Sequence, residues 1–209
     1  MSDPAPGRAE SGFTLAEIAV VLVIIALLTA GALSAFRIQN QRAQFAEARA
    51  QLEEARQALI NYAAVTGALP CPDTNEDGQQ DAPCAGGGSI RGDLPWRQLA
   101  LPQRDTWGSV IRYEVHRDFT ATATLSLSEP GSVDIVSRDG TGADVALADP
   151  AAVAFAIWSR GADTSDTSEG DTEVVATSPT SDDIVVWLSR FVLIGRLLEA
   201  GRDVPQSAP

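Results

Sequence analysis

The sequence has very few of the residues that bind transition metals. Its 209 residues include one histidine, His116, and two cysteines, Cys71 and Cys84. One histidine excludes a multi-histidine zinc or iron site within a single chain. Two cysteines exclude a four-cysteine zinc site and an iron–sulfur cluster held by this chain alone. The pair can form one disulfide, which requires an oxidising compartment.

Positive charge is scarce as well. The chain holds 15 Lys and Arg against 28 Asp and Glu, a formal net charge of −13. Because phosphate binding needs clustered Lys and Arg to release counterions, this balance argues against a nucleic-acid partner. The length suffices for one medium domain with a sizeable core, or for a smaller domain with a tail.

A long hydrophobic run lies near the N-terminus. Residues 18–36 carry no charge and are long enough, at about 1.5 Å per residue, to cross most of the roughly 30 Å core of a bilayer. We expect a transmembrane helix here. A conventional cleavable signal peptide would place basic residues before the run and a small-residue cleavage site after it. Here Arg8 is the only basic residue ahead of the run, and Gly12 also precedes it.

Glu17 stands at the start of this run. An ionised carboxylate inside hydrocarbon costs several kcal/mol on most estimates unless it finds a partner. We therefore expect a partner for Glu17. The alternative is that Glu17 lies at the level of the lipid headgroups and is hydrated.

Residues 12–17 read GFTLAE and lead directly into the hydrophobic run. This pattern resembles the class III signal of type IV prepilins and type II secretion pseudopilins. The resemblance implies cleavage after Gly12 by a prepilin peptidase and N-methylation of the new terminus at Phe13. It also implies that the Glu17 carboxylate pairs with the Phe13 amine of a neighbouring subunit. Such a pair neutralises both charges in an apolar interior and could fix the register between subunits.

The chain differs from that family in two respects. Its leader, residues 1–12, is net acidic where the family's leaders are usually basic, which would weaken orientation in the membrane. The proline common midway along type IV pilin helices is absent, and Ser34 lies near that place. The missing proline favours a straight helix.

Residues 37–66 are rich in Ala, Gln, Glu, Arg and Leu and contain no helix breaker, so they should continue the helix until Gly67 and Pro70 end it. An apolar stripe along one face consists of Phe45, Leu52 and Leu59, with Ala48, Ala55 and Ala63 between them. We expect the stripe to pack within the chain; a coiled coil with a partner is the alternative. An unbroken helix over residues 13–66 would extend roughly 80 Å. Its first half must therefore be stabilised by lipid or by other subunits.

The remainder of the chain predicts an α+β head. Antiparallel strands with one face against the helix are expected at residues 111–115, 121–128, 133–137, 153–159 and 184–187. A C-terminal helix is expected within residues 187–201, with Trp187, Phe191, Ile194 and Leu198 at helical spacing and Gly201 as C-cap. Residues 161–183 are rich in acidic residues without Lys or Arg, which is typical of a solvated, mobile loop.

The expected organisation is therefore a leader at residues 1–12, a transmembrane and assembly helix at 13–36, an amphipathic helix at 37–66 and a globular head at 67–209. This is a pilin-like α+β fold, with a long N-terminal helix packed on an antiparallel sheet and a short C-terminal helix. Parts of the head also resemble bacterial prepilin-like proteins related to type II secretion pseudopilins: LPCPDTNEDG at residues 69–78, GDLPW at 92–96, DTWG at 105–108 and DDIVVW at 182–187.

One loop of the head partly matches a calcium-binding loop. The side chains at positions one, three, five and nine are Asp73, Asn75, Asp77 and Asp81, and position six is a glycine. Position twelve, normally a bidentate glutamate, falls on Cys84. Calcium is one interpretation; the other is a hydrated loop of Asx turns held by a disulfide between Cys71 and Cys84. By resemblance to calcium-binding pseudopilins, the acidic residues 163–183 are a second, weaker calcium candidate.

Catalytic chemistry has little support. His116, Asp118 and a serine could be drawn as a triad, but no G-x-S-x-G pattern is present, and a solvent-facing strand histidine is expected. The four tryptophans, Trp96, Trp107, Trp158 and Trp187, could form a binding platform, although core anchors are favoured. We do not expect an enzyme.

The resulting hypothesis is a pilin-like filament subunit of the inner membrane with its head in the periplasm, most specifically a minor pseudopilin of a type II secretion system. Its partners would be prepilin peptidase, other pilin-like subunits, an inner-membrane assembly platform and secreted proteins. A minor pilin of a type IV pilus is the alternative within this class. A membrane-anchored periplasmic binding protein, perhaps calcium-dependent, that never polymerises is the alternative from another class.

Overall fold

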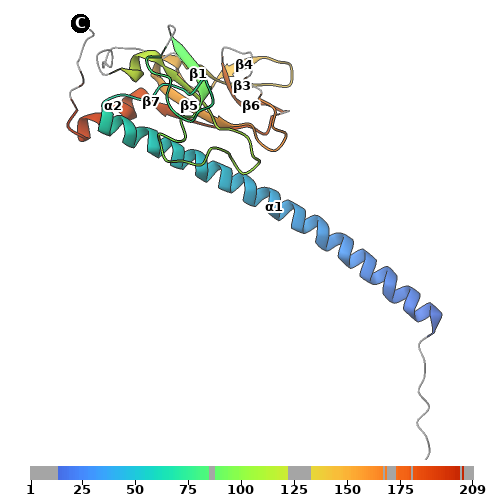
Figure 1. Ribbon diagram of the computed structural model, residues 1–209. Coiled ribbons are helices and arrows are strands. Elements are labelled where there is room, and N and C mark those ends of the chain that lie inside the picture. Colours follow the sequence, from blue (N-terminus) through green and yellow to red (C-terminus); the bar gives the residue numbers. More distant parts are fainter. Residues whose placement is uncertain are drawn as a thin grey trace, which may run out of the picture. The chain divides into compact units, whose positions relative to one another are not determined.

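A computed structural model describes residues 14–84, 88–121, 133–166, 168, 173–179, 181–202 and 204 of the chain. The leader, Gly12, Phe13 and most of the strand expected at 121–128 lie outside these residues. The chain divides into two compact units, Met1–Ala43 and Gln44–Pro209. Figure 1 shows the elements of both units.

The helix α1, Leu15–Thr66, begins in the first unit and ends in the second. No proline interrupts it, and Gly67 ends it with a left-handed φ of 88° that disfavours any residue with a Cβ. The Gly67 backbone N–H donates to the Ala63 carbonyl at 2.7 Å and closes the last turn. The expected helix boundary at Thr66 is confirmed.

The second unit contains a four-stranded antiparallel sheet in the order β1–β2–β5–β7 (Figure 1). These strands are β1 (Ser89–Asp93), β2 (Arg112–His116), β5 (Val153–Ser159) and β7 (Ile184–Ser189). A smaller sheet, β4–β3–β6, combines β3 (Ile135–Arg138), β4 (Asp144–Ala146) and β6 (Val174–Thr177). The short helix α2, Arg190–Glu199, follows β7, and two 3₁₀ turns, Arg117–Thr120 and Pro150–Ala152, complete the elements.

The apolar stripe of α1 packs on the four-stranded sheet. Ala48, Leu52, Ala55, Leu59 and Ala63 are all buried, and the large members belong to one core with residues of β2, β5, β7 and α2. Phe45 at the start of the stripe is half-exposed and packs edge-to-face on Trp107, with ring centroids 5.0 Å apart. The predicted packing within the chain is confirmed, as is the α+β class.

Strand β5 is buried along its whole length because it separates two cores. Phe155 and Ile157 face the core shared with α1, whereas Ala156 and Trp158 belong to a second core with Val174. A strand covered on both faces favours apolar residues at successive positions, which explains the unbroken apolar run over residues 153–158.

Three of the expectations for the head are wrong in part. Residues 161–183 are not only a loop, because they contain β6, which pairs in parallel with β3 rather than antiparallel. Trp187 lies in β7, since the Ser189 hydroxyl accepts from the Phe191 N–H and starts α2 only there. Strands β1 and β4 were not expected at all, since SIRGD and DVA lack a continuous apolar pattern.

The buried face of α2 also differs from the expected stripe. Leu193, Ile194 and Leu197 are buried, whereas Phe191 and Leu198 are exposed. The N-cap residue Ser189, which follows Leu188 of β7, fixes where the helix begins and which of its side chains are buried. A helical spacing counted from Trp187 does not.

Substituting Leu52 tests the packing of α1 on the sheet. Leu52→Ala should lower the free energy of unfolding of the detergent-purified chain by about 2–5 kcal/mol, because a fully buried leucine leaves a cavity. The control Gln57→Ala, at an exposed position of the same helix, should change it by about 0.5 kcal/mol or less. Equal effects from both variants would contradict this packing.

Candidate functional site

The first turn of α1 is capped by Thr14. The Glu17 backbone N–H donates to the Thr14 hydroxyl at 3.3 Å and to its carbonyl at 3.1 Å. The order Thr-x-x-Glu is that of a capping box, in which the hydroxyl satisfies a backbone donor that the helix leaves unpaired. The interpretation of Glu17 from the sequence did not include this cap, although Thr14 and Glu17 stand at the spacing of a capping box.

The Glu17 side chain itself is exposed. It lies in the first helical turn, where the positive end of the helix dipole favours a negative charge. The cap therefore uses the backbone N–H of Glu17 and not its carboxylate.

An apolar surface follows Glu17 on every side of the helix. All described side chains from residue 14 to residue 29 are exposed, and they include Leu15, Ile18, Leu22 and Leu28. The hydroxyl of Thr29 donates to the carbonyls of Ile25 and Ala26, so this polar group is satisfied within the helix. A helix that is apolar all round needs apolar surroundings.

Within the part of the chain that the structure describes, no helix combines the length and hydropathy required to cross a membrane.

Residues 7–33 match the model of the prokaryotic N-terminal methylation motif. The chain carries a type IV pilin-like N-terminus. The motif implies processing by prepilin peptidase, assembly with other pilin-like subunits and a membrane-anchored N-terminus. Gly12, Phe13 and Glu17 all fall within the matched residues. The chain matches no curated protein and no solved structure.

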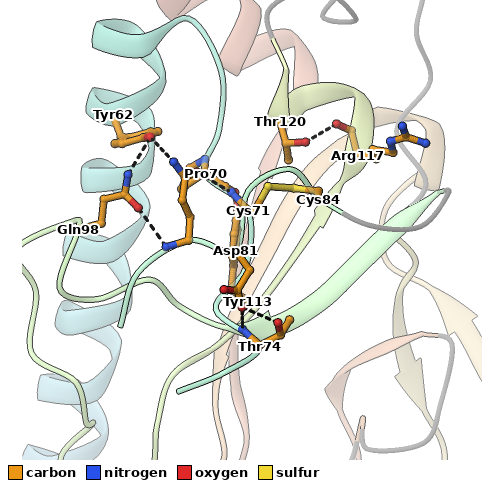
Figure 2. The surroundings of a disulfide bond; sticks show 11 residues. Tyr62, Pro70, Cys71, Thr74, Asp81, Cys84, Gln98, Tyr113, Arg117 and Thr120 are labelled. Atoms are coloured by element: carbon orange, nitrogen blue, oxygen red, sulfur yellow. Dashed lines mark hydrogen bonds between the residues drawn. A yellow bond between two sulfur atoms is a disulfide. The ribbon is translucent and has the colours of Figure 1, made fainter. Parts of the chain in front are cut away.

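The head of the chain contains the one disulfide that its two cysteines allow. Cys71 and Cys84 are joined, with their Cα atoms 5.5 Å apart (Figure 2). The bond closes the loop that partly matches a calcium-binding sequence. A disulfide of this kind lowers the conformational entropy of the unfolded chain and so stabilises the folded loop.

Carboxylates inside the loop bind its own backbone. Asp73 is buried, and its Oδ1 accepts from the N–H groups of Asn75 and Glu76 while Oδ2 accepts from the Gly78 N–H at 2.7 Å. Gly78 has a φ of 83°, and a Cβ there would lie 2.6 Å from the Trp96 ring, so only glycine fits. These are the contacts of consecutive Asx turns.

Asp81 closes the loop. Its Oδ2 accepts from the backbone N–H of Thr74 at 2.7 Å and from the Thr74 hydroxyl, and its Oδ1 accepts from the Asn75 side-chain amide at 2.7 Å. Figure 2 shows the contact between Asp81 and Thr74. The Thr74 hydroxyl, followed by its backbone N–H, lowers the pKa of Asp81 below the ordinary value of an aspartate.

The carboxylates of the loop bear on the predicted calcium site. Among the described residues, no three acidic, histidine or cysteine side chains gather as a group that could hold a metal ion. The side-chain oxygens of the candidate ligands instead accept hydrogen bonds within the loop; these ligands are Asp73, Asn75, Asp77 and Asp81. The geometry fits the disulfide-held loop better than a calcium site, and calcium at Asp73, Asn75, Asp77 and Asp81 stays a prediction.

The loop is fixed to α1 and to the core. The Tyr62 hydroxyl on α1 accepts from the side-chain amides of Gln80 and Gln98, at 3.2 and 3.0 Å (Figure 2). The Tyr113 hydroxyl donates to the Pro70 carbonyl at 3.1 Å, and burial raises the pKa of this phenol well above its ordinary value. The disulfide loop therefore links the C-terminal end of α1 to the sheet.

Two described carboxylates in the acidic segment after β5 also accept hydrogen bonds from nearby N–H groups and so stabilise turns. Asp182 Oδ2 accepts from the N–H groups of Ala162 and Asp163, and Asp166 Oδ1 accepts from the Trp158 indole N–H at 3.1 Å. Gly161, with a φ of 66°, lets Asp182 approach this closely. Calcium in residues 163–183 likewise stays a prediction.

The remaining residues singled out from the sequence have structural positions. His116 is buried beside Phe119, so the expectation of a solvent-facing histidine is wrong; its Nδ1 lies 3.5 Å from an oxygen of Asp118. The imidazole is covered because His116 lies at the end of β2, where the chain turns into the 3₁₀ helix that carries Phe119. Trp158 is fully buried, as expected of a core anchor, while Trp96, Trp107 and Trp187 are half-buried.

Arg91 is a structural residue that the sequence did not reveal. Its guanidinium donates to Glu114 Oε2 at 2.8 Å and to the Ser168 carbonyl, and it lies over the Trp158 ring. The contacts connect β1 and β2 to the segment before β6. No local pattern predicts them, because Ser168 is 77 positions further along the chain.

The pH dependence of the disulfide loop follows from Asp81. Because its pKa is lowered, the ionised form stabilises the native loop above the ordinary aspartate pKa, and this contribution is lost as the pH falls through the lowered value. Thr74→Val should raise the Asp81 pKa toward that of an ordinary aspartate in an NMR titration. Thr106→Val, at a threonine remote from Asp81, should leave it unchanged; a Thr74→Val titration identical to that of the unmodified chain would contradict the assignment.

Proposed function

We propose that this pilin-like chain is a pseudopilin of a type II protein secretion system, present as a minor subunit. The observation that carries the proposal is the methylation motif joined to a helix whose first half is apolar on every side. A surface of this kind is stable where lipid or the helices of other subunits cover it. The chain would be cleaved after Gly12, methylated at Phe13 and anchored in the inner membrane, with its head in the periplasm.

Glu17 would supply the specificity of assembly. Cleavage after Gly12 would create an amine at Phe13, four residues before an exposed carboxylate at the start of the apolar helix. In an apolar filament interior neither charge is stable alone, so each favours the partner on a neighbouring subunit. The capping hydrogen bond leaves the carboxylate available for this role, since it uses the Glu17 backbone and the Thr14 side chain.

Two further features support a secretion pseudopilin. Helix α1 lacks the proline that is common midway along type IV pilin helices. The disulfide between Cys71 and Cys84 suits the oxidising periplasm. The pilin-like motif belongs to structural subunits, and we propose no catalytic role. The partners would be prepilin peptidase, other pilin-like subunits, the inner-membrane assembly platform and the secreted proteins.

Complementation of a strain that lacks this chain tests the proposal. Glu17→Gln should reduce secretion of exoproteins to the level of the deletion strain, because the charge pair is lost while the size of the side chain is kept. Thr14→Ala is the matched control: it removes the capping hydroxyl but keeps the carboxylate, and it should retain most of the secretion. The readouts are exoprotein in the culture supernatant and pilus-dependent surface motility.

The alternatives give different results in the same strains. Normal secretion with lost motility in the deletion strain would assign the chain to a type IV pilus. Full function with Glu17→Gln would exclude assembly through this carboxylate and favour an anchored binding protein that does not polymerise.

A further inference from the structure

A polar pocket of about 340 Å³ lies on the second unit. Its walls come from the disulfide loop, from the adjacent ends of β1, β2 and β5, and from the turn at residues 103–110. Most of the residues that line it are charged or polar; they include Glu76, Trp96, Gln103, Ser109, Arg112 and Arg160. We call it the Ser109 pocket. Its volume is at the lower end of the range of sites that bind small molecules.

The walls of the Ser109 pocket are held by hydrogen bonds. Asp73 in the disulfide loop and Asp93 at the end of β1 form two backbone hydrogen bonds, at 2.9 and 2.8 Å. The buried Asp105 carboxylate accepts from the backbone N–H of Ser109 at 2.8 Å and so fixes the turn that carries it. A ligand therefore meets walls that are already ordered, which lowers the entropic cost of binding.

The charges of the pocket are paired and balanced. The Arg112 guanidinium donates to Asp93, and the Nε atoms of Arg112 and Arg160 lie 3.6 and 3.7 Å from Asp166 Oδ2. The Asp73 carboxylate accepts from three backbone N–H groups. The charged lining residues are three arginines and three acids, namely Arg104, Arg112, Arg160, Asp73, Glu76 and Asp93. This lining has no excess of either sign that would select an ion.

Several polar groups of the walls do not bind one another. Ser109 is only 7% exposed, yet its hydroxyl forms no hydrogen bond with any residue that the structure describes. Within the same described part of the chain, no partner is found for the Gln103 amide, the Trp96 indole N–H or the Glu76 carboxylate. The Arg160 Nε is buried and lacks a hydrogen bond there as well. Polar groups at a covered site are stable where water or a ligand satisfies them.

The chemistry of these groups favours a ligand with several hydroxyl groups. The N–H groups of Arg160 and Trp96 only donate, the Glu76 carboxylate only accepts, and the side chains of Ser109 and Gln103 do both. Because a hydroxyl group also donates and accepts, a ring that bears several of them can satisfy every one of these groups. No set of acidic side chains suited to a metal ion occurs among the described residues.

Trp96 adds an apolar surface beside the polar groups. Its ring packs against Gly78, where a Cβ would lie 2.6 Å away, and the Arg97 guanidinium lies 4.9 Å from a ring centroid of Trp96. These contacts fix the half-buried ring where it lines the pocket. A sugar ring has C–H groups on its faces and hydroxyl groups at its edge, so an indole beside polar side chains matches both.

We propose that the Ser109 pocket binds one ring of a neutral glycan. Ser109 and Gln103 exchange hydrogen bonds with the sugar hydroxyl groups, Arg160 donates to them, and the Trp96 ring contacts the C–H groups. The volume of the pocket holds a single ring, so the neighbouring rings of the glycan lie outside it. This binding site goes beyond the proposed role in secretion and does not depend on it.

Saturation-transfer NMR on the full-length chain tests the proposal. The chain is purified in a detergent without a sugar headgroup, because an alkyl glycoside would compete for the site. The neutral probes are cellotriose, maltotriose, mannotriose and chitotriose. We expect saturable binding of at least one of them with a dissociation constant of about 1 mM, as befits a few hydrogen bonds in a small pocket.

Two variants and a control locate the binding. Gln103→Ala and Ser109→Ala should each weaken it about tenfold, because each removes a hydrogen bond to a sugar hydroxyl. Gln57→Ala, at an exposed glutamine of α1 outside the pocket, should leave it unchanged. Gln103 forms no side-chain hydrogen bond within the described part of the chain, so Gln103→Ala should keep the unfolding temperature even where Ser109→Ala lowers it.

Charged probes complete the test. Glucuronate and glycylglycine should bind more weakly than the best neutral probe, because the lining is balanced in charge. Stronger binding of either charged probe overturns the proposal in favour of an ionic or zwitterionic ligand. Neutral sugar binding that both pocket variants leave unchanged also overturns it, since the sugar then binds elsewhere. Absence of binding by all four neutral probes at about 10 mM overturns it in favour of a hydrated pocket.

Discussion

The structure depends on one constraint: the first half of α1 is apolar on all sides and exposed over the residues that the structure describes there. All of its described side chains from residue 14 to residue 29 are exposed. Such a helix is not stable as a hydrated element, since its apolar surface would remain in water. Its few polar groups form hydrogen bonds within the helix: Thr14 caps the first turn, and Thr29 donates to the preceding turn. Glu17 is the exception, and its carboxylate is exposed.

The second half of the same helix packs against the rest of the head. Between Ala48 and Ala63 a narrow stripe of small and large apolar residues packs on the sheet, while the other faces stay polar. Strand β5 lies behind this contact and joins it to a second core around Trp158. The disulfide loop, held by Tyr62 and Tyr113, fixes the C-terminal end of the helix to the head. A single helix is thus an exposed apolar element in one unit and a core element in the other.

Local patterns in the sequence were sufficient for much of this account. The seven-residue spacing of Leu52 and Leu59 predicted the packed face of α1, the run over residues 153–159 predicted β5, and the two cysteines predicted the disulfide. What could not be predicted depends on contacts between distant residues. Strand β6 forms because β3 lies beside it, and Arg91 is placed by Glu114 and Ser168. The buried residues of α2 were not predicted, because the helix begins after its N-cap Ser189 and the helical spacing expected from the sequence began at Trp187.

The intact mass of the chain purified from its native membrane, with the sequence of its N-terminal peptide, tests the central claim most directly. The chain contains no lysine, so its N-terminus provides the only primary amine. The account predicts a mature chain that starts at Phe13 and carries one methyl group on that amine, and an unprocessed chain in a strain without prepilin peptidase. A chain that begins at Met1 or Ser2 in both strains would contradict the claim that this protein is processed and assembled as a pilin-like subunit.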